Sequence, residues 1–191
     1  MKDLSILMLN KKSIDDFSNE RNSMLENAKT EWVLFVDTDE IVPKALEKEI
    51  SEAIKNKTYE GYYIKRKIYF CGTVAGEDKM LKLGKRDAGK WTRKVHEVWD
   101  IHGKIGILNN FIIHNTANNL TDYIKKVDYH STLHAKEVMR EGKRSNLIKI
   151  IIYSLGNFVV YLFKSKNIVF SIMKSLHSYL SWTKLYFLQH S

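Results

Sequence analysis

Three carboxylates, at Asp37, Asp39 and Glu40, follow the apolar run Trp32–Val36. An unbroken apolar run of this length is typical of a strand that is buried on both faces, as in a parallel sheet. Open α/β sheets bind their ligands at the carboxyl ends of the strands, which is where these acids would lie. If the chain stays extended, Asp37 and Asp39 point to the same side, because strand side chains alternate. Two carboxylates held that way can bind Mg²⁺ or Mn²⁺, and the cation can hold a diphosphate.

The same motif has two other interpretations. Asp-x-Asp is a weak signal, because solvated acids in a surface turn after a core strand give the same pattern. The run Asp37-Thr38-Asp39 also resembles haloacid-dehalogenase-type phosphatases, in which the first aspartate is a nucleophile. Those enzymes place this strand first and carry a later acidic pair. Here a predicted helix precedes the strand and no Asp-Asp pair follows it.

Strands and helices alternate around this motif, which predicts an α/β fold. Helices are predicted at Ser18–Ala28, with Ser18 as the N-cap, and from Pro43 onward. A third is predicted from the cap Asn119 to Arg140, with Gly142 as its stop, followed by two apolar helices parted at Lys164–Asn167. Strands are predicted at Leu4–Leu9, Trp32–Val36, Tyr59–Phe70, Met80–Leu83, Val95–Trp99, Ile105–Leu108 and Phe111–His114.

Charge is distributed unevenly along the 191 residues. The net charge of the whole chain is +9, and the segment from Gly142 to Ser191 holds seven basic residues and no acidic one. That segment is also rich in aliphatic and aromatic residues, a combination that favours an anionic membrane surface over nucleic acid as a partner. A single cysteine, Cys71, excludes an internal disulfide framework.

The order of several motifs resembles bacterial family 2 glycosyltransferases of the lipopolysaccharide-core and surface-glycan type. The motifs are Asp16–Ser18, Arg21-Asn22, Glu31–Glu40, Gly61–Arg66, Leu81–Leu83, Trp91, Val95–Glu97, Gly103-Lys104 and Ile113-His114. Each is weak alone, whereas their order and spacing together are fairly specific. The resemblance covers nearly the whole chain and includes the basic, apolar tail.

The resemblance implies a GT-A (Rossmann-like) fold, a nucleotide-sugar donor, a glycan or glycolipid acceptor, a divalent metal and inversion at the sugar carbon. Asp37 and Asp39 would then bind Mg²⁺ or Mn²⁺, which neutralises the leaving diphosphate. An inverting transfer also needs a carboxylate that takes the acceptor proton, and Glu97 is the candidate. Lys82 could contact phosphate, as could Arg86. His96 could reach the diphosphate or the metal from a distorted strand end.

A complete enzyme of this type begins with strands that bind the nucleobase and end in an Asp-Ser-Gly-Ser-like turn. We find no counterpart here, so we expect the chain to start near the third strand of that fold. The main alternative is therefore a non-catalytic remnant that binds a membrane or a partner. We expect a partial GT-A sheet domain at 1–118, a connecting helix at 119–142 and a membrane-associated tail at 143–191. The expected location is the cytoplasmic face of the cell membrane.

Overall fold

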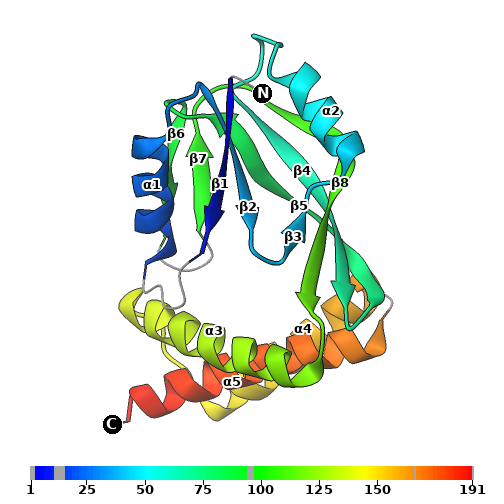
Figure 1. Ribbon diagram of the computed structural model, residues 1–191. Coiled ribbons are helices and arrows are strands. Elements are labelled where there is room, and N and C mark those ends of the chain that lie inside the picture. Colours follow the sequence, from blue (N-terminus) through cyan, green and yellow to red (C-terminus); the bar gives the residue numbers. More distant parts are fainter. Residues whose placement is uncertain (1–2, 11–15, 94–96, 166, 191) are drawn as a thin grey trace. The chain divides into compact units, whose positions relative to one another are not determined.

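The computed structural model describes residues 3–10, 16–93, 97–165 and 167–190 (Figure 1). The chain divides into two compact units. Unit 1 comprises Met1–Lys67 and Asp78–His114, and unit 2 comprises Ile68–Glu77 and Asn115–Ser191. The predicted boundaries after residues 118 and 142 stay a prediction.

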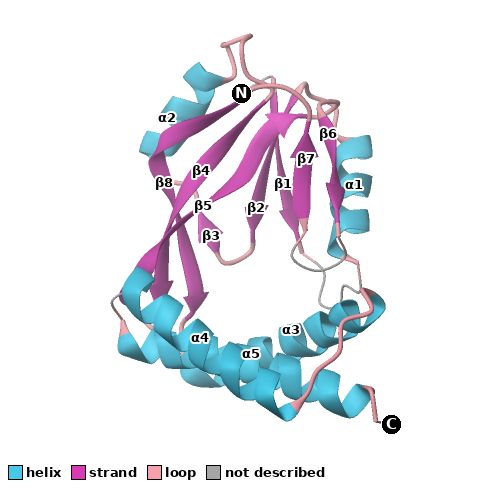
Figure 2. Ribbon diagram, turned by 180° about the vertical axis from the view of Figure 1, so that it is seen from behind, coloured by secondary structure: helices cyan, strands magenta, loops and turns pink. Residues whose placement is uncertain are grey.

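Within the described residues, six strands form one mixed sheet in the order β1-β2-β5-β4-β8-β3 (Figure 2). These strands are β1 (Leu4–Leu9), β2 (Trp32–Asp37), β3 (Glu40–Ile41), β4 (Gly61–Phe70), β5 (Thr73–Lys85) and β8 (Ile105–Ala117). β1 runs parallel to β2, β5 antiparallel to β2, and β3 antiparallel to β8. A separate ribbon pairs β6 (Gly89–Thr92) with β7 (Val98–Ile101). The predicted α/β class with a helical C-terminal tail is confirmed.

β2 is buried on both faces, as its apolar run predicts. Trp32, Leu34 and Val36 belong to one core cluster, which α2 (Lys44–Ala53) covers with its apolar stripe. Val33 and Phe35 belong to a second cluster, together with residues of α1 (Phe17–Asn27) and the β6–β7 ribbon. A strand with this much apolar contact on each side is a rigid support for the residues that follow it.

Three helices complete unit 2, namely α3 (Leu120–Arg140), α4 (Leu147–Ser165) and α5 (Ile168–Leu188). Asn119 caps α3 by accepting a hydrogen bond from the Asp122 amide, and Asn167 caps α5 in the same way. Lys184 joins α5 to α3, because its Nζ donates to Asp128 Oδ1 at 2.7 Å and also to a backbone carbonyl and two hydroxyls. The three predicted C-terminal helices are confirmed.

Several predicted details are wrong. Asp16, not Ser18, caps α1, because its Oδ1 accepts from the Asn19 amide at 3.0 Å while the Ser18 hydroxyl also donates to it. The predicted strand Met80–Leu83 is confirmed as strand but is only part of the longer β5, which forms a hairpin with β4. The turn of that hairpin places Cys71 at φ 47° and Gly72 at φ 78°, and a cysteine there is not a usual turn signal.

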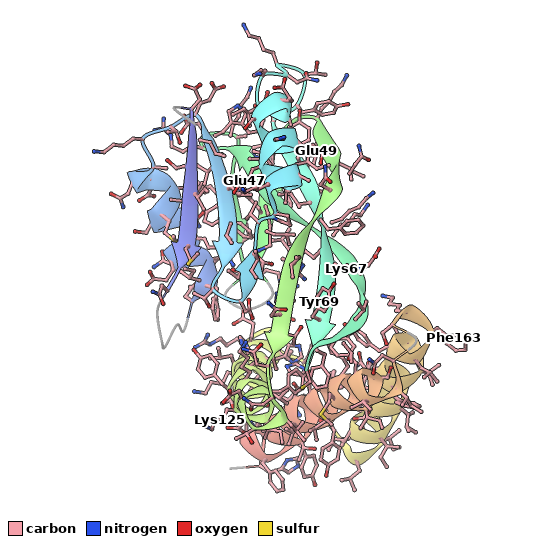
Figure 3. All side chains as sticks on the ribbon, turned by 45° about the vertical axis from the view of Figure 1, so that its right-hand side comes forward. Glu47, Glu49, Lys67, Tyr69, Lys125 and Phe163 are labelled. Carbon is pink, nitrogen blue, oxygen red and sulfur yellow. The ribbon has the colours of Figure 1, made fainter. Side chains whose placement is uncertain are left out.

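The other errors concern the second half of the sheet. The predicted strands Ile105–Leu108 and Phe111–His114 are one continuous strand, β8. The intervening asparagines resemble a turn, but the backbone amides of Asn109 and Asn110 donate to the Glu49 carboxylate of α2. Figure 3 shows Glu49 on that helix. β7 begins at Val98, so Glu97 is not part of it, whereas the predicted start at Val95 lies outside the described residues. β6 was not predicted.

Candidate functional site

The site begins where β2 ends. Asp37 is the last residue of β2, Thr38 and Asp39 form a turn, and Glu40 begins the short strand β3. The chain is therefore not extended from Asp37 to Asp39, so strand alternation does not place their side chains on one side. The turn instead returns Glu40 toward Asp37, whose amide donates to Glu40 Oε2 at 3.0 Å.

Arg21 of α1 connects two of the candidate carboxylates. Its Nη2 donates to Asp37 Oδ1 at 2.8 Å and its Nε donates to Glu97 Oε1 at 3.0 Å. The guanidinium is buried against two aromatic rings, 5.2 Å from the centre of Phe35 and 4.8 Å from that of Trp91. The second core cluster thus holds a cation in place between the end of β2 and Glu97.

Lys82 of β5 provides the other cation. Its side chain is only 2% exposed, and its Nζ donates to Asp37 Oδ2 at 2.8 Å and to Glu40 Oε2 at 2.7 Å. The Glu40 side chain is fully buried, and its Oε1 also accepts from Arg66 of β4 at 3.3 Å. Arg66 in turn forms a bidentate pair with Asp78, at 2.7 and 2.6 Å. We call these residues, from Glu97 through Arg21, Asp37, Lys82, Glu40 and Arg66 to Asp78, the charge network.

The charge network alters the protonation of its members. Burial by itself would raise the pKa of Asp37, but the Lys82 ammonium and the Arg21 guanidinium outweigh it and hold this pKa well below its usual range. Burial opposes the charge on Arg21 as well, and Asp37 and Glu97 overcome it and raise the pKa of Arg21. Asp37 is therefore ionised at neutral pH and poorly suited to accept a proton in catalysis.

Asp39 lies beside a histidine of β8. His114 Nδ1 is 3.4 Å from Asp39 Oδ1 and 3.8 Å from Glu40 Oε1. This Nδ1 and the Nη1 of Arg21 are two of six buried side-chain atoms that have no hydrogen-bond partner among the described residues. A buried polar atom without a partner costs about 1–3 kcal/mol, so such atoms point to a place where a ligand group could bind.

The other predicted site residues are distributed as follows. Glu97 joins the charge network through Arg21. Lys82 joins it as a buried partner of two carboxylates. Arg86 lies apart from it, since its guanidinium donates to Asp87 and to the Ala28 carbonyl. His96 lies outside the described residues, so its predicted contact with the diphosphate or the metal stays a prediction.

Comparison with known proteins gives three related chains, whereas no family model matches. The lipopolysaccharide core biosynthesis glycosyltransferase LpsC of Rhizobium meliloti is 26% identical over 144 residues, which cover 71% of this chain and 53% of that protein. Uncharacterized glycosyltransferases of Rickettsia typhi and Rickettsia prowazekii are each 22% identical over 158 residues, covering 73% of this chain and 54% of theirs. The chain is distantly homologous to bacterial glycosyltransferases. It spans about half the length of these curated relatives.

Four members of the charge network were not predicted as site residues: Arg21, Glu40, Arg66 and Asp78. Arg21, Glu40 and Arg66 lie in motifs that carry the resemblance, but only their burial and contacts indicate a role at the site. The structure shows the Glu40 side chain fully buried, and a buried carboxylate requires a cation as its partner. Lys82, which interrupts the apolar end of β5, is that cation.

The described residues fit a divalent metal poorly at Asp37. Each of its two carboxylate oxygens already accepts from a basic group, Oδ1 from Arg21 and Oδ2 from Lys82. Across the described part of the chain, no group of three or more His, Cys, Asp or Glu side chains is arranged to hold a metal ion. An ion bound there would have to displace Lys82 or Arg21, or bind mainly through Asp39. The metal role of Asp37 and Asp39 stays a prediction.

Titration with Mn²⁺, followed by the paramagnetic relaxation of water protons, tests that role. We expect weak binding that is lost in Asp39→Ala, because the Asp39 carboxylate lies in the turn after β2 and is 28% exposed. Asp87→Ala is the control, since Asp87 is an exposed carboxylate outside the charge network. Equal binding by wild type and Asp39→Ala would remove Asp39 from the metal site.

Proposed function

We propose that this chain takes part in sugar transfer from a nucleotide-sugar donor to a cell-surface glycan or lipopolysaccharide-core acceptor. The single observation that carries the proposal is the distant homology, which includes a relative named for lipopolysaccharide core biosynthesis. The position of the site supports it, because the carboxylates gather at the carboxyl end of a buried strand.

In this proposal the transfer inverts the sugar carbon. The acceptor hydroxyl attacks that carbon while the bond to the diphosphate breaks, and Glu97 takes the hydroxyl proton. Arg21 holds the Glu97 carboxylate in place through Nε. Asp37 remains an anion paired with Lys82 and Arg21, so it orients these cations rather than accepting a proton. Asp39 supplies a carboxylate in the turn beside His114. A Mg²⁺ or Mn²⁺ ion bound by Asp39 would supply positive charge that stabilises the leaving diphosphate.

Calorimetric titration with a panel of nucleotide sugars tests the proposal. We expect one donor to bind, and Asp39→Asn to weaken that binding about tenfold or more, since a hydrogen bond to a charged group is worth about 1.5–3 kcal/mol. Asp100→Asn is the matched control, because Asp100 lies exposed on β7. The measurement uses this chain and the longest polypeptide that its gene encodes. If neither form binds any donor, the alternative of a non-catalytic protein is favoured.

A further inference from the structure

α4 exposes most of its apolar side chains, whereas the outward face of a water-soluble helix is polar. Its exposed residues include Leu147, Ile148, Ile151, Ile152, Leu155, Val159, Val160 and Phe163. Phe163 is 77% exposed and projects from the end of α4 in Figure 3. Ser154, by contrast, is one of the buried residues of this helix. An apolar stripe of this length on a protein surface marks a site of interaction with a protein or a membrane.

Small polar residues lie between α4 and α5, beside aromatic contacts of Tyr153 with Trp182 and of Tyr161 with Phe170. Ser154, Ser171, Ser178 and Ser181 are buried. Ser175 Oγ donates to the Ser154 carbonyl at 2.8 Å, and Asn157 Nδ2 donates to Ser178 Oγ at 3.1 Å. Helices that pack in lipid show this arrangement, because apolar side chains lose nothing by facing hydrocarbon while small residues and hydrogen bonds hold the helices together.

The charges of the helical hairpin formed by α4 and α5 indicate which kind of surface it binds. From Gly142 to Ser191 there is no acidic residue, and basic residues lie at both ends of α4. Lys149 follows the start of this helix and is partly exposed, and Lys164, near its end, is exposed. A surface that contacts both ends of α4 at once must therefore be anionic and extended, which describes the headgroups of one bilayer leaflet.

A transmembrane crossing fits less well than a helix that lies in the plane of the membrane. By length and composition alone, α4 could span a bilayer, and it is the one candidate among the described residues. α5 packs along α4, with Ser175 donating to the Ser154 carbonyl, and carries Lys174, His177 and Lys184. If α4 crossed the hydrocarbon, α5 and its basic residues would have to enter the hydrocarbon as well. Otherwise the contacts between α4 and α5 would have to break.

We propose that the α4–α5 hairpin lies flat at the boundary between the headgroups and the acyl chains of an anionic bilayer, with the outward face of α4 in hydrocarbon. The basic side chains at the two ends of α4 then contact the headgroups of a single leaflet. This proposal does not depend on the sugar-transfer reaction, so either can fail without the other.

Vesicle flotation tests the binding surface. Ile148→Gln/Ile152→Gln changes two residues of α4 that are 66% and 60% exposed, and Ile6→Gln/Ile107→Gln is a matched control at residues of unit 1 that are 54% and 51% exposed. With phosphatidylcholine vesicles that contain phosphatidylglycerol, wild type and control should float, and less so as salt rises. The partition coefficient of the α4 variant should fall about a hundredfold.

The depth of α4 distinguishes a flat helix from a spanning one. Ile148→Cys, Leu155→Cys and Phe163→Cys, each with Cys71→Ser, are labelled with an environment-sensitive fluorophore and quenched by lipids brominated at shallow or deep positions. All three residues lie on the exposed face, and a helix of 19 residues is about 28 Å long. Equal shallow depth at the three positions is expected for a flat helix.

Three results would overturn the proposal. One is equal flotation of the α4 variant and the wild type. Another is a deep label at Leu155 between shallow labels at Ile148 and Phe163, which would indicate a transmembrane span. The third is self-association that needs Ile148 and Ile152 without any binding to vesicles, which would make a second copy of the chain the partner of α4.

Discussion

Replacing Lys82 by methionine should lower the free energy of unfolding by about 3–5 kcal/mol, because it removes the buried cation that pairs with both Asp37 and the fully buried Glu40. Lys82 Nζ contacts Asp37 and Glu40 at 2.8 and 2.7 Å, and the Glu40 side chain is fully buried. Arg66 contacts only the other Glu40 oxygen, at the longer distance of 3.3 Å, so it cannot replace the ammonium. Methionine preserves most of the length of the side chain, so the loss reports mainly the charge.

Urea denaturation at several pH values measures this effect. Asp37 has its pKa lowered from 3.8, so its stabilising effect is present above that value and is lost as the pH falls through the lower folded pKa. Without Lys82 the pKa of Asp37 is lowered less. The difference in unfolding free energy between wild type and Lys82→Met should therefore be largest near neutral pH and shrink as the pH falls from about 5 toward 2.

Lys85→Met is the matched control on the same strand. Lys85 pairs with Glu60 at 3.0 Å, but both side chains are partly exposed, at 22% and 32%. Pairs of this kind contribute about 0–1 kcal/mol. A loss below about 1 kcal/mol in Lys82→Met as well would contradict a stabilising role for the charge network.

Local patterns predicted the elements well where each residue had one dominant role. The apolar run Trp32–Val36 predicted a strand that is buried on both faces, because a strand with core packing on each side has apolar residues at every position. Asn119 predicted the start of α3 because its side chain can accept a hydrogen bond from the first turn. The apolar, basic composition after Gly142 likewise predicted the helices α4 and α5.

The site was harder to predict, because it depends on contacts between residues far apart in the chain. Arg21 and Glu97 are 76 residues apart, and Lys82 and Asp37 are 45 apart. A sequence pattern does not show that Lys82 lies buried between two carboxylates rather than exposed to a phosphate. It also does not show that the chain turns after Asp37, since that turn follows from the pairing of Glu40 and Ile41 with β8.

The burial of serines between α4 and α5 could not be predicted from the sequence for a related reason. In the sequence, Ser154 of α4 and Ser171 and Ser178 of α5 look like ordinary polar residues of a helix, which a soluble protein would expose. Only the structure shows that they are buried while Ile148, Ile151 and Ile152 of α4 are exposed. Helical periodicity identifies two different faces of a helix, but it does not say which of them meets protein and which meets the surroundings.

Glu97→Gln should reduce turnover by about 10²–10⁴-fold while donor affinity stays close to the wild-type value, if the proposed sugar transfer is correct. Glutamine cannot take the proton of an acceptor hydroxyl. It can still accept the hydrogen bond from Arg21 Nε, which holds Glu97 Oε1 at 3.0 Å, so the position of the side chain should be kept. The loss should therefore appear in kcat rather than in donor binding.

The measurement compares kcat and calorimetric donor affinity in the longest polypeptide that the gene encodes, with a surface-glycan acceptor. Glu60→Gln is the matched control, because Glu60 is also a glutamate held by one basic side chain, Lys85, and lies outside the charge network. Near-normal turnover in Glu97→Gln would place the base elsewhere. Asp39 would then be the next residue to test, because its carboxylate lies in the turn that follows β2, whereas Asp37 is held as an anion by two cations.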